Sequence, residues 1–155
     1  MHRLILLFVT FATFASAQDT QVLTIDRPAD AVEPITFTLE ALDRMTQVEI
    51  KASNEFVDGM TTFTGPLARV VLAGVGMTRE DQVRFVAINE YEVMIAATDL
   101  FEYDVILATR ANNQVLSRRD KGPIWLIYPT SDHPELQDAR INSKLIWQVT
   151  KIEVQ

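Results

Sequence analysis

The stretch RRDKGPIWLIYP, residues 118–129, joins a charged loop directly to an apolar run. Glycine adopts conformations that other residues avoid, and proline fixes φ at the entrance of the run. Residues 124–128 therefore predict a strand that is buried on both faces, in the middle of a sheet. A rigid strand supports the loop before it, so the charged residues 118–121 are candidates for a binding site. The alternative is a solvated turn whose charges bind nothing.

The first 17 residues have the features of a secretory signal peptide. Arg3 precedes an apolar stretch of about 11 residues, which is too short to span a bilayer as a helix, and Ala15-Ser16-Ala17 is typical of a cleavage site. We therefore expect cleavage after Ala17, removal of residues 1–17 and export of the mature protein. Residues 18–155 are expected to form a single domain, because a chain of this size has one core.

The composition excludes several chemistries. The chain has no cysteine, so it lacks a thiolate metal ligand, a cysteine nucleophile and a redox pair. Without the leader, His133 is the one histidine, which cannot supply a two-histidine metal site. A net charge of −7 makes nucleic acids and anionic membranes poor partners. With 48% hydrophobic residues, the core alone can hold the protein together.

Alternation of apolar and polar residues predicts mainly strands. They are expected at 22–25, 35–37, 47–52, 83–88, 91–96, 105–109 and 144–154. Asn89-Glu90 and Asn112-Asn113 indicate two hairpin turns, because asparagine tolerates positive φ. The chain has no regular alternation of strands with helices. The predicted fold class is therefore α+β, with a mixed, mainly antiparallel sheet and short helices.

The helices are expected to be short. Thr38 is a suitable N-cap for one of them. Gly65-Pro66 predicts the start of another, with proline at its first position, and Gly74 and Gly76 predict its end. After Pro129 comes a polar loop of about 14 residues, which is longer than usual and therefore expected to be functional or disordered.

Two groups of residues remain as candidates for a site: the charged loop, and rings and amides near strand ends. A planar heterocycle needs a ring to stack on, a carboxylate for an amidine-like edge, and amides or arginines for its carbonyls. The candidate cofactor-binding residues are Asn89, Tyr91, Arg118, Arg119, Asp120, Lys121, Trp125, Tyr128 and Trp147. The alternative for each aromatic residue is a place in the core.

Four segments in order carry a family resemblance: FTGPLARVVLAGVG (63–76), VRFVAINEYEVMIAATDL (83–100), VILATRANNQVLSRRDKGPIWLIYP (105–129) and LIWQVTKIEV (145–154). Together they resemble the molybdopterin-binding domain of the sulfite-oxidase fold, the oxidoreductase molybdopterin-binding family. The resemblance extends over nearly all of the chain from about Phe37 onward. It is most marked for the small exported members of that family.

The resemblance implies a sulfite-oxidase-type fold and a pterin cofactor, either a reduced pterin or a molybdopterin-like one. In the large oxidoreductases of the family, a cysteine thiolate binds molybdenum in the region that corresponds to residues 53–62. No metal is expected here, because the chain has no cysteine. Some small periplasmic proteins of this kind resemble partners of membrane-bound diguanylate cyclases, phosphodiesterases or sensor kinases, to which they report the presence of a reduced pterin.

Three hypotheses follow. The first is a periplasmic pterin-binding protein without enzymatic activity, whose partner is the periplasmic region of a membrane signalling protein. The second is a molybdopterin-dependent oxidoreductase subunit that uses a metal ligand other than thiolate. The third is a ligand-free interaction domain of the same fold.

Overall fold

The computed structural model describes residues 20–30 and 33–155. The predicted signal peptide, residues 1–17, lies outside this part of the chain. Within the described part, none of the helices is both long and apolar enough to cross a bilayer. The fold is α+β with mixed, mostly antiparallel sheets and short helices, which confirms the predicted class.

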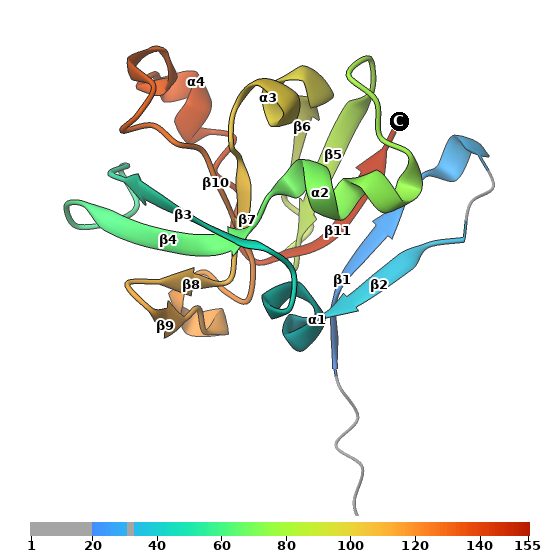
Figure 1. Cartoon of the computed structure of the whole chain (residues 1–155), viewed down its shortest axis with the longest axis horizontal. Helices are drawn as coiled ribbons and strands as arrows, with labels where there is room; N and C mark the ends of the chain where they lie inside the picture. The colour runs from blue at the N-terminus through green and yellow to red at the C-terminus, as the bar shows by residue number, and fades with distance from the viewer. Residues whose placement is uncertain (1–19, 31–32) are drawn as a thin grey trace, which may run out of the picture.

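The largest sheet has five strands in the order β2-β1-β11-β5-β6. β1 and β11 run parallel, and the other neighbours are antiparallel. β5 and β6 form the first predicted hairpin. In Figure 1 this sheet occupies the half of the molecule that contains the C-terminus. The strands span Ile35–Thr38 (β2), Gln21–Asp26 (β1), Val149–Val154 (β11), Gln82–Ala87 (β5) and Glu92–Ala96 (β6).

A second sheet has four strands in the order β3-β4-β8-β9. They span Gln47–Ala52 (β3), Thr61–Pro66 (β4), Arg110–Ala111 (β8) and Gln114–Val115 (β9). Between the two sheets lies an antiparallel pair of short strands, β7 and β10. They span Ile106–Ala108 (β7) and Trp125–Ile127 (β10).

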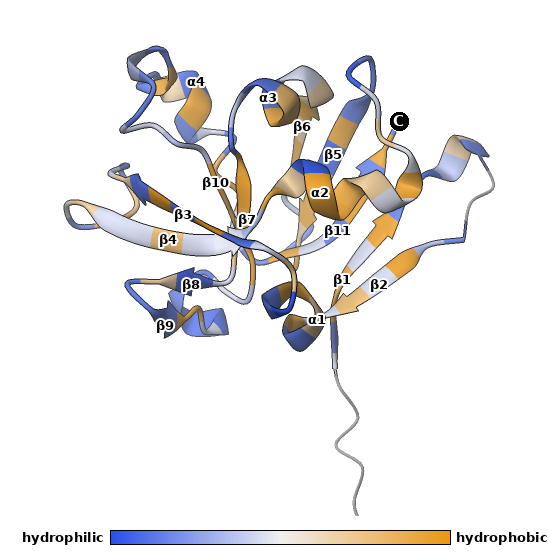
Figure 2. Ribbon diagram, in the orientation of Figure 1, coloured by the Kyte–Doolittle hydropathy of each residue, from blue (hydrophilic) through white to orange (hydrophobic). Residues whose placement is uncertain are grey.

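β10 is buried on both faces, as predicted. Trp125 and Ile127 belong to a smaller core against β3 and β4, whereas Leu126 and Tyr128 belong to a larger core against the five-stranded sheet. The prediction that this strand lies in the middle of a sheet is wrong: β7 is its one ladder partner, and its other edge forms a single bridge between Trp125 and Trp147. In Figure 2, β7 is hydrophobic along most of its length, as a strand between two cores must be.

Short helices complete the fold. α1 (Leu39–Asp43) begins where predicted, because Thr38 Oγ1 accepts a hydrogen bond of 3.1 Å from Ala41 N. α2 (Ala68–Leu72) continues into the 3₁₀ turn η2 (Ala73–Val75), which ends at Gly76 with φ of 71°. α2 contacts α3 (Ala97–Glu102), and Figure 1 shows the two side by side.

The long loop after Pro129 contains helical turns. They are η4 (Pro134–Leu136) and α4 (Ala139–Asn142), whose N-cap Asp138 accepts a hydrogen bond from Arg140 N. Thr130 Oγ1 in this loop donates to Ser53 O, at 3.4 Å. The loop is therefore packed beside the end of β3.

The predicted start of the second helix is wrong. Pro66 is the last residue of β4, where it pairs with Gln47, and α2 begins two residues later at Ala68. A Cβ on Gly65 would lie 2.1 Å from Leu107 O, so this glycine is needed for close strand packing rather than for a helix start.

The last strand is shorter than predicted. β11 begins at Val149, because Gln148 has φ of 54° and interrupts the extended backbone. The backbone N of Gln148 donates to Lys121 O, and the backbone O of Gln148 accepts from Ile88 N. Leu145 and Ile146, which come before β11, are buried without being in a strand, which explains why alternation alone extended the prediction to residue 144.

The two hairpin turns are where the asparagines indicate, with differences in detail. In the first, Glu90 and not Asn89 has positive φ, and Asn89 Oδ1 instead accepts a hydrogen bond from Tyr91 N. In the second, Asn112 and Asn113 both have positive φ. The arms of that hairpin are β8 and β9, because residues 106–108 pair with β10 instead.

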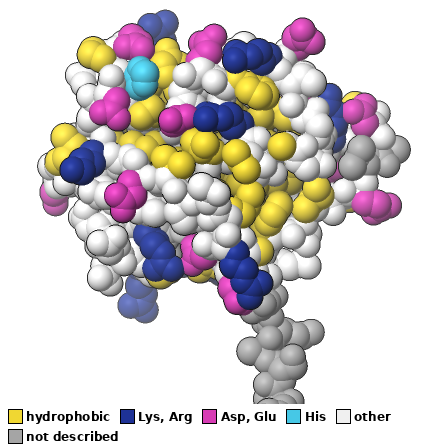
Figure 3. Space-filling view, viewed as in Figure 1, with side chains coloured by type: hydrophobic (Ala, Val, Ile, Leu, Met, Phe, Trp, Pro, Cys, Tyr) yellow, Lys and Arg dark blue, Asp and Glu magenta, His cyan; other side chains and the backbone are white. Residues whose placement is uncertain are grey.

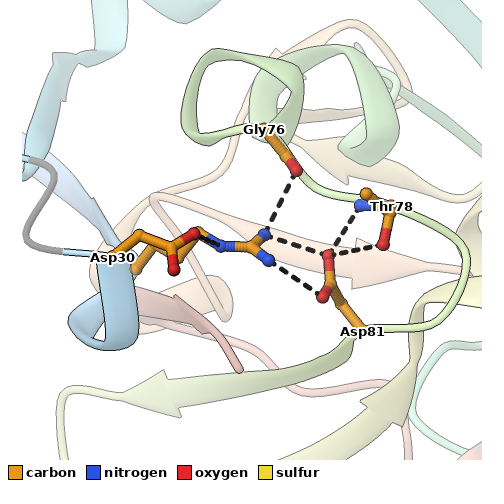
Figure 4. Close-up of polar contacts among 5 residues, drawn as sticks. Asp30, Gly76, Thr78 and Asp81 are labelled. Atoms are coloured by element: carbon orange, nitrogen blue, oxygen red, sulfur yellow. Dashed lines mark hydrogen bonds and ion pairs between the residues drawn. The ribbon is translucent and has the colours of Figure 1, made fainter.

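Arg27, after β1, is clamped by polar contacts that Figure 4 shows. Its guanidinium donates to both carboxylate oxygens of Asp81, at 3.0 and 3.1 Å, to Asp30 Oδ2 at 2.5 Å and to Gly76 O at 3.1 Å. Asp81 also accepts from Thr78 N, at 2.6 Å. These bonds attach the N-terminal strand to the loop before β5.

Charged side chains of both signs are interspersed on the surface. Figure 3 shows one such face, with a hydrophobic patch among them. Every described arginine other than Arg79, Arg118 and Arg119 forms an ion pair with a carboxylate. Most of the positive charge is therefore locally neutralised.

Candidate functional site

A cavity of about 280 Å³ opens beside Trp147. We call it the ring pocket. Three parts of the chain form it: the loop after β3, the β5–β6 hairpin, and the end of α4 with the segment that leads to β11. Its lining residues are Phe56, Ala87, Asn89, Tyr91, Asn142, Ser143, Leu145, Ile146 and Trp147.

Trp147 is fixed in this pocket by aromatic contacts. Its ring is in edge-to-face contact with Phe56, at a centroid distance of 5.0 Å, and with Trp125, at 6.2 Å. Trp147 is half-buried, whereas Tyr91 on the hairpin is 53% exposed. The pocket therefore combines a rigid indole with a tyrosine at its open side, which suits a flat ligand.

Uncharged polar groups accompany the rings. Asn89 uses Oδ1 to accept from Tyr91 N, and its Nδ2 has no partner among the described residues. The side-chain amide of Asn142 likewise has no hydrogen bond within the described part of the chain. The Ser143 hydroxyl donates to Arg140 O. Both amides are thus available to the donor and acceptor groups of a ligand.

A larger polar cleft, about 550 Å³, adjoins the ring pocket and shares Asn142 with it. Ser53, Asn54 and Met60, from the loop between β3 and β4, line one part of it, and the α4 segment with Asp138 lines another. Asn54 Nδ2 is buried without a hydrogen-bond partner in the described structure. The cleft therefore offers further uncharged groups next to the ring pocket.

The electrostatics of both cavities are neutral to negative. Among the described residues that line them, none is lysine or arginine. Hydrogen bonds from Arg140 lower the pKa of Asp138 to about 2, so this carboxylate stays ionised. Within residues 20–30 and 33–155, no three His, Cys, Asp or Glu side chains are grouped as a metal site would require.

Three predicted site residues meet in the ring pocket, namely Asn89, Tyr91 and Trp147. Two others, Trp125 in β10 and Tyr128 directly after it, are core residues that belong to different cores. Whether the three pocket residues contact a ligand stays a prediction.

The two core aromatics have their polar atoms occupied. Trp125 Nε1 donates to Leu145 O at 3.0 Å. Tyr128 OH donates to Asp99 Oδ2 at 3.0 Å, and burial together with the Asp99 charge raises the pKa of Tyr128 well above its usual value. Lys144 Nζ approaches the same carboxylate oxygen, at 2.6 Å. These atoms stabilise the fold.

The charged residues of the predicted site lie in a separate place. Arg118, Arg119 and Asp120 form the exposed 3₁₀ turn η3 (Arg118–Asp120), and Lys121 Nζ lies over the Trp125 ring at 5.2 Å. Arg118 lines a third cavity, between this turn and β1. The structure therefore does not bring the charged loop and the ring pocket into one cavity.

Sequence reasoning missed Phe56, Asn142 and Ser143, which complete the ring pocket. Phe56 lies in a loop with acidic neighbours, where a single aromatic residue gives no pattern. The other two lie at the end of the long loop after Pro129. Its unusual length was the signal that could have found them.

The chain is thus an α+β domain with a cavity lined by aromatic rings and uncharged polar groups. The family model described as "oxidoreductase molybdopterin binding domain" matches residues 12–131. This chain belongs to that family, the sulfite-oxidase-type molybdopterin-binding domains. No curated protein matches the chain at the required significance.

The residues present fit one part of the family's cofactor and not another. Rings and amides in the ring pocket suit a pterin bicycle. The loop between β3 and β4, where the family resemblance implies the metal-binding region, contributes Ser53, Asn54 and Met60 to the cleft, and the chain has no cysteine. The donor set thus does not fit thiolate-bound molybdenum, and the lining offers no cation to a phosphate.

Proposed function

We propose that this chain is a periplasmic pterin-binding protein without enzymatic activity, which reports its ligand state to a membrane-bound signalling partner. The observation that carries the proposal is the ring pocket: an anchored indole, a tyrosine at the open side and two amides without partners in the described structure. No metal is part of the proposal.

The size and chemistry of the pocket support a small unsubstituted or lightly substituted ring. Its volume of about 280 Å³ is close to the lower end of the range for small-molecule pockets, roughly 300 to 1,000 Å³. A pteridine edge carries both donors and acceptors, and an amide side chain supplies both. Asn89 and Asn142 can therefore pair with such an edge while the rings stack.

The neutral to negative lining supports a pterin without phosphate. A phosphorylated cofactor would bring charge of at least −1 to a protein of net charge −7, into cavities whose described lining contains no lysine or arginine. A molybdenum oxidoreductase would also need a ligand that replaces thiolate. The ring pocket favours binding over redox chemistry for this reason.

The position of the pocket supports a signalling role. Tyr91 is 53% exposed on the β5–β6 hairpin, so a ligand that stacks there changes the surface that a partner contacts. Such a change can report to a partner whether the ligand is bound. The family resemblance to partners of membrane signalling proteins supports the same role, and the partner would be the periplasmic region of such a protein.

The test is a titration of the purified protein with a tetrahydropterin under anaerobic conditions, followed by tryptophan fluorescence. We expect Trp147 to be quenched on binding. Tyr91→Ala and Asn89→Ala should each weaken binding by about 1 to 3 kcal/mol, or roughly 5- to 150-fold in Kd, because stacking or a buried hydrogen bond is lost. Met94→Ala, on the same hairpin but outside the pocket, and Gln114→Ala, on β9, are the matched controls.

Two results would contradict the proposal. Unchanged affinity in both Tyr91→Ala and Asn89→Ala, with folding intact, would remove the ring pocket from the pterin site. Stoichiometric molybdenum in protein purified from the periplasm would favour the oxidoreductase hypothesis instead. Mass spectrometry of material released on denaturation separates a pterin-binding protein from a ligand-free domain.

A further inference from the structure

The loop around η3 is held in one conformation by hydrogen bonds. Ser117 O accepts from Asp120 N at 2.9 Å and from Gly122 N at 2.7 Å, and Ser117 Oγ donates to Asp120 Oδ2 at 2.6 Å. Gln148 Nε2 donates to Arg118 O at 2.6 Å. A Cβ on Gly122 would lie 2.0 Å from a backbone oxygen, so the loop packs closely against the preceding chain. These contacts give the exposed loop a defined backbone conformation.

Two guanidinium groups project from this loop without partners. Arg118 and Arg119 are exposed, and neither side chain forms a hydrogen bond or an ion pair with another described residue. Asp120, the one carboxylate of the loop, accepts from Ser117 instead. The protein has a net charge of −7, and most of its described arginines form ion pairs with carboxylates. Arg118 and Arg119 are adjacent and differ from them in forming no ion pair with a described residue.

A cavity of about 260 Å³ lies against Arg118, between the loop, β1 and β11. We call it the Arg118 cavity. Its lining combines aliphatic side chains with hydroxyls, and Ile88 in it is 48% exposed. The residues that matter here are Val22, Thr24, Ile88, Arg118, Pro123 and Thr150.

We propose that the η3 loop and the Arg118 cavity form a docking site for an acidic segment of another protein. One aliphatic side chain of that segment enters the cavity against Val22, Ile88 and Pro123, and flanking carboxylates pair with Arg118 and Arg119. Charge complementarity favours this occupant. The net charge of −7 makes most of this protein's surface repel an acidic segment, whereas Arg118 and Arg119 attract it to the η3 loop. The docking does not depend on which ligand the ring pocket takes.

The composition of the cavity favours a peptide over a small anion. A small anion is bound by several convergent donors, whereas Arg118 is the one cation in the described lining and the Gln148 amide already donates to Arg118 O. Ile88 and Val22 would contact an anion unfavourably but suit an aliphatic side chain.

The docking site and the ring pocket also adjoin the same two segments. Trp147 lines the ring pocket and Gln148 lines the Arg118 cavity. In the hairpin, Asn89 lines the first and Ile88 the second. A segment bound at η3 therefore contacts residues adjacent in sequence to those of the ring pocket.

The experiment is amide NMR of the ¹⁵N-labelled protein without pterin, titrated with the peptide EELEE. We expect shifts at Ile88, Arg118 and Thr150, and weaker binding when salt rises from about 0.05 to about 0.5 M, because screening shortens the reach of the charges. The double variant Arg118→Glu/Arg119→Glu should bind about tenfold more weakly. Ile88→Ser should also bind more weakly, through loss of the aliphatic contact, with both arginines in place.

The matched control is Lys51→Glu/Arg79→Glu, which makes the same change in net charge at two cations that also lack ion pairs in the described structure. It should bind EELEE as the unchanged protein does. EESEE, without the aliphatic anchor, and KKLKK, with reversed charge, should bind more weakly than EELEE.

Three results would overturn the proposal. EELEE could fail to shift the amides of the loop and cavity. Acetate or phosphate could shift them as strongly as the peptide does, which would define a small-anion site. Sedimentation could show that the protein dimerises through this loop, so that a second copy covers it. Each of these results is distinguishable from a failure of pterin binding, because pterin binding is measured by tryptophan fluorescence and peptide binding by amide NMR.

Discussion

Position along the chain decides what the aromatic residues near residue 125 do. Tyr128 comes three positions after Trp125, directly after the end of β10, so the two side chains point to opposite sides of the extended chain and enter different cores. Trp147, outside the strand, contacts Trp125 edge to face and has its other side available to the ring pocket. Three aromatic residues that look alike in the sequence thus have different roles.

Alanine substitutions should separate these roles. Trp125 is 2% exposed and Trp147 is half-buried, so Trp125→Ala should lower the free energy of unfolding by about 3 to 5 kcal/mol and Trp147→Ala by clearly less. Urea denaturation followed by circular dichroism measures both. A larger loss for Trp147→Ala would show that Trp147 is mainly a core residue and would weaken its assignment to the ring pocket.

At the scale of elements, a row of alternating charges crosses the five-stranded sheet on the face away from the larger core. Lys151 on β11 pairs with Glu153 and lies 4.0 Å from Asp26 on β1. Arg84 on β5 pairs with Glu153 and, at 3.2 Å, with Glu92 on β6. Cross-strand pairs of opposite charge support the register, and a charged face resists stacking against another sheet.

Acid should destabilise the protein through two carboxylates, Asp81 in the Arg27 clamp and Glu153 in this charged row. Hydrogen bonds from Arg27 lower the pKa of Asp81 below 3.8, and those from Lys151 and then Arg84 lower the pKa of Glu153 below 4.5. Because the folded values lie below the unfolded ones, their stabilisation is complete above about pH 5 and is lost as the pH falls through the folded values. Unfolding free energies measured from neutral pH to about pH 3 should therefore fall less steeply in Asp81→Asn than in the unchanged protein.

The control for the acid experiment is the exposed ion pair of Arg44 with Glu40. Arg44→Gln should change the unfolding free energy by less than about 1 kcal/mol at neutral pH, because exposed pairs contribute little. An equally steep fall with acid in Asp81→Asn would show that the clamp on Arg27 does not carry the pH dependence.

At the scale of the whole molecule, two cores share one pair of strands. β7 and β10 contribute alternate side chains to both, so neither core can lose this pair without exposing the other. We expect a single cooperative transition for this reason. Both tryptophans belong to or pack against the smaller core, so fluorescence reports that core, while circular dichroism reports the whole chain. Non-coincident urea curves from the two probes would show that the cores unfold separately.

Export is a prediction for the whole chain. The intact mass of protein from the periplasm should correspond to a chain that starts at Gln18. Retention of Met1 in a membrane fraction would contradict it, and with it the periplasmic location in the proposed function.

Local sequence patterns predicted much of the fold, because they act over a few residues. The Thr38 cap, the asparagine hairpin turns and the strand buried on both faces follow from side-chain reach, from tolerance of positive φ and from hydrophobic periodicity. These local patterns were sufficient to predict the α+β fold class. They also selected Asn89, Tyr91 and Trp147 as rings and amides near strand ends, and these three residues line the ring pocket.

What only the tertiary structure decided depends on contacts between distant segments. Strand pairing made Pro66 the end of a strand, and the positive φ of Gln148 ended β11 early, where alternation predicted otherwise. The ring pocket is assembled from three separated segments, and the charged loop lies at another cavity. Hydrophobic periodicity predicts that a residue is buried but not which core or cavity it faces, because that depends on the partner that packs against it.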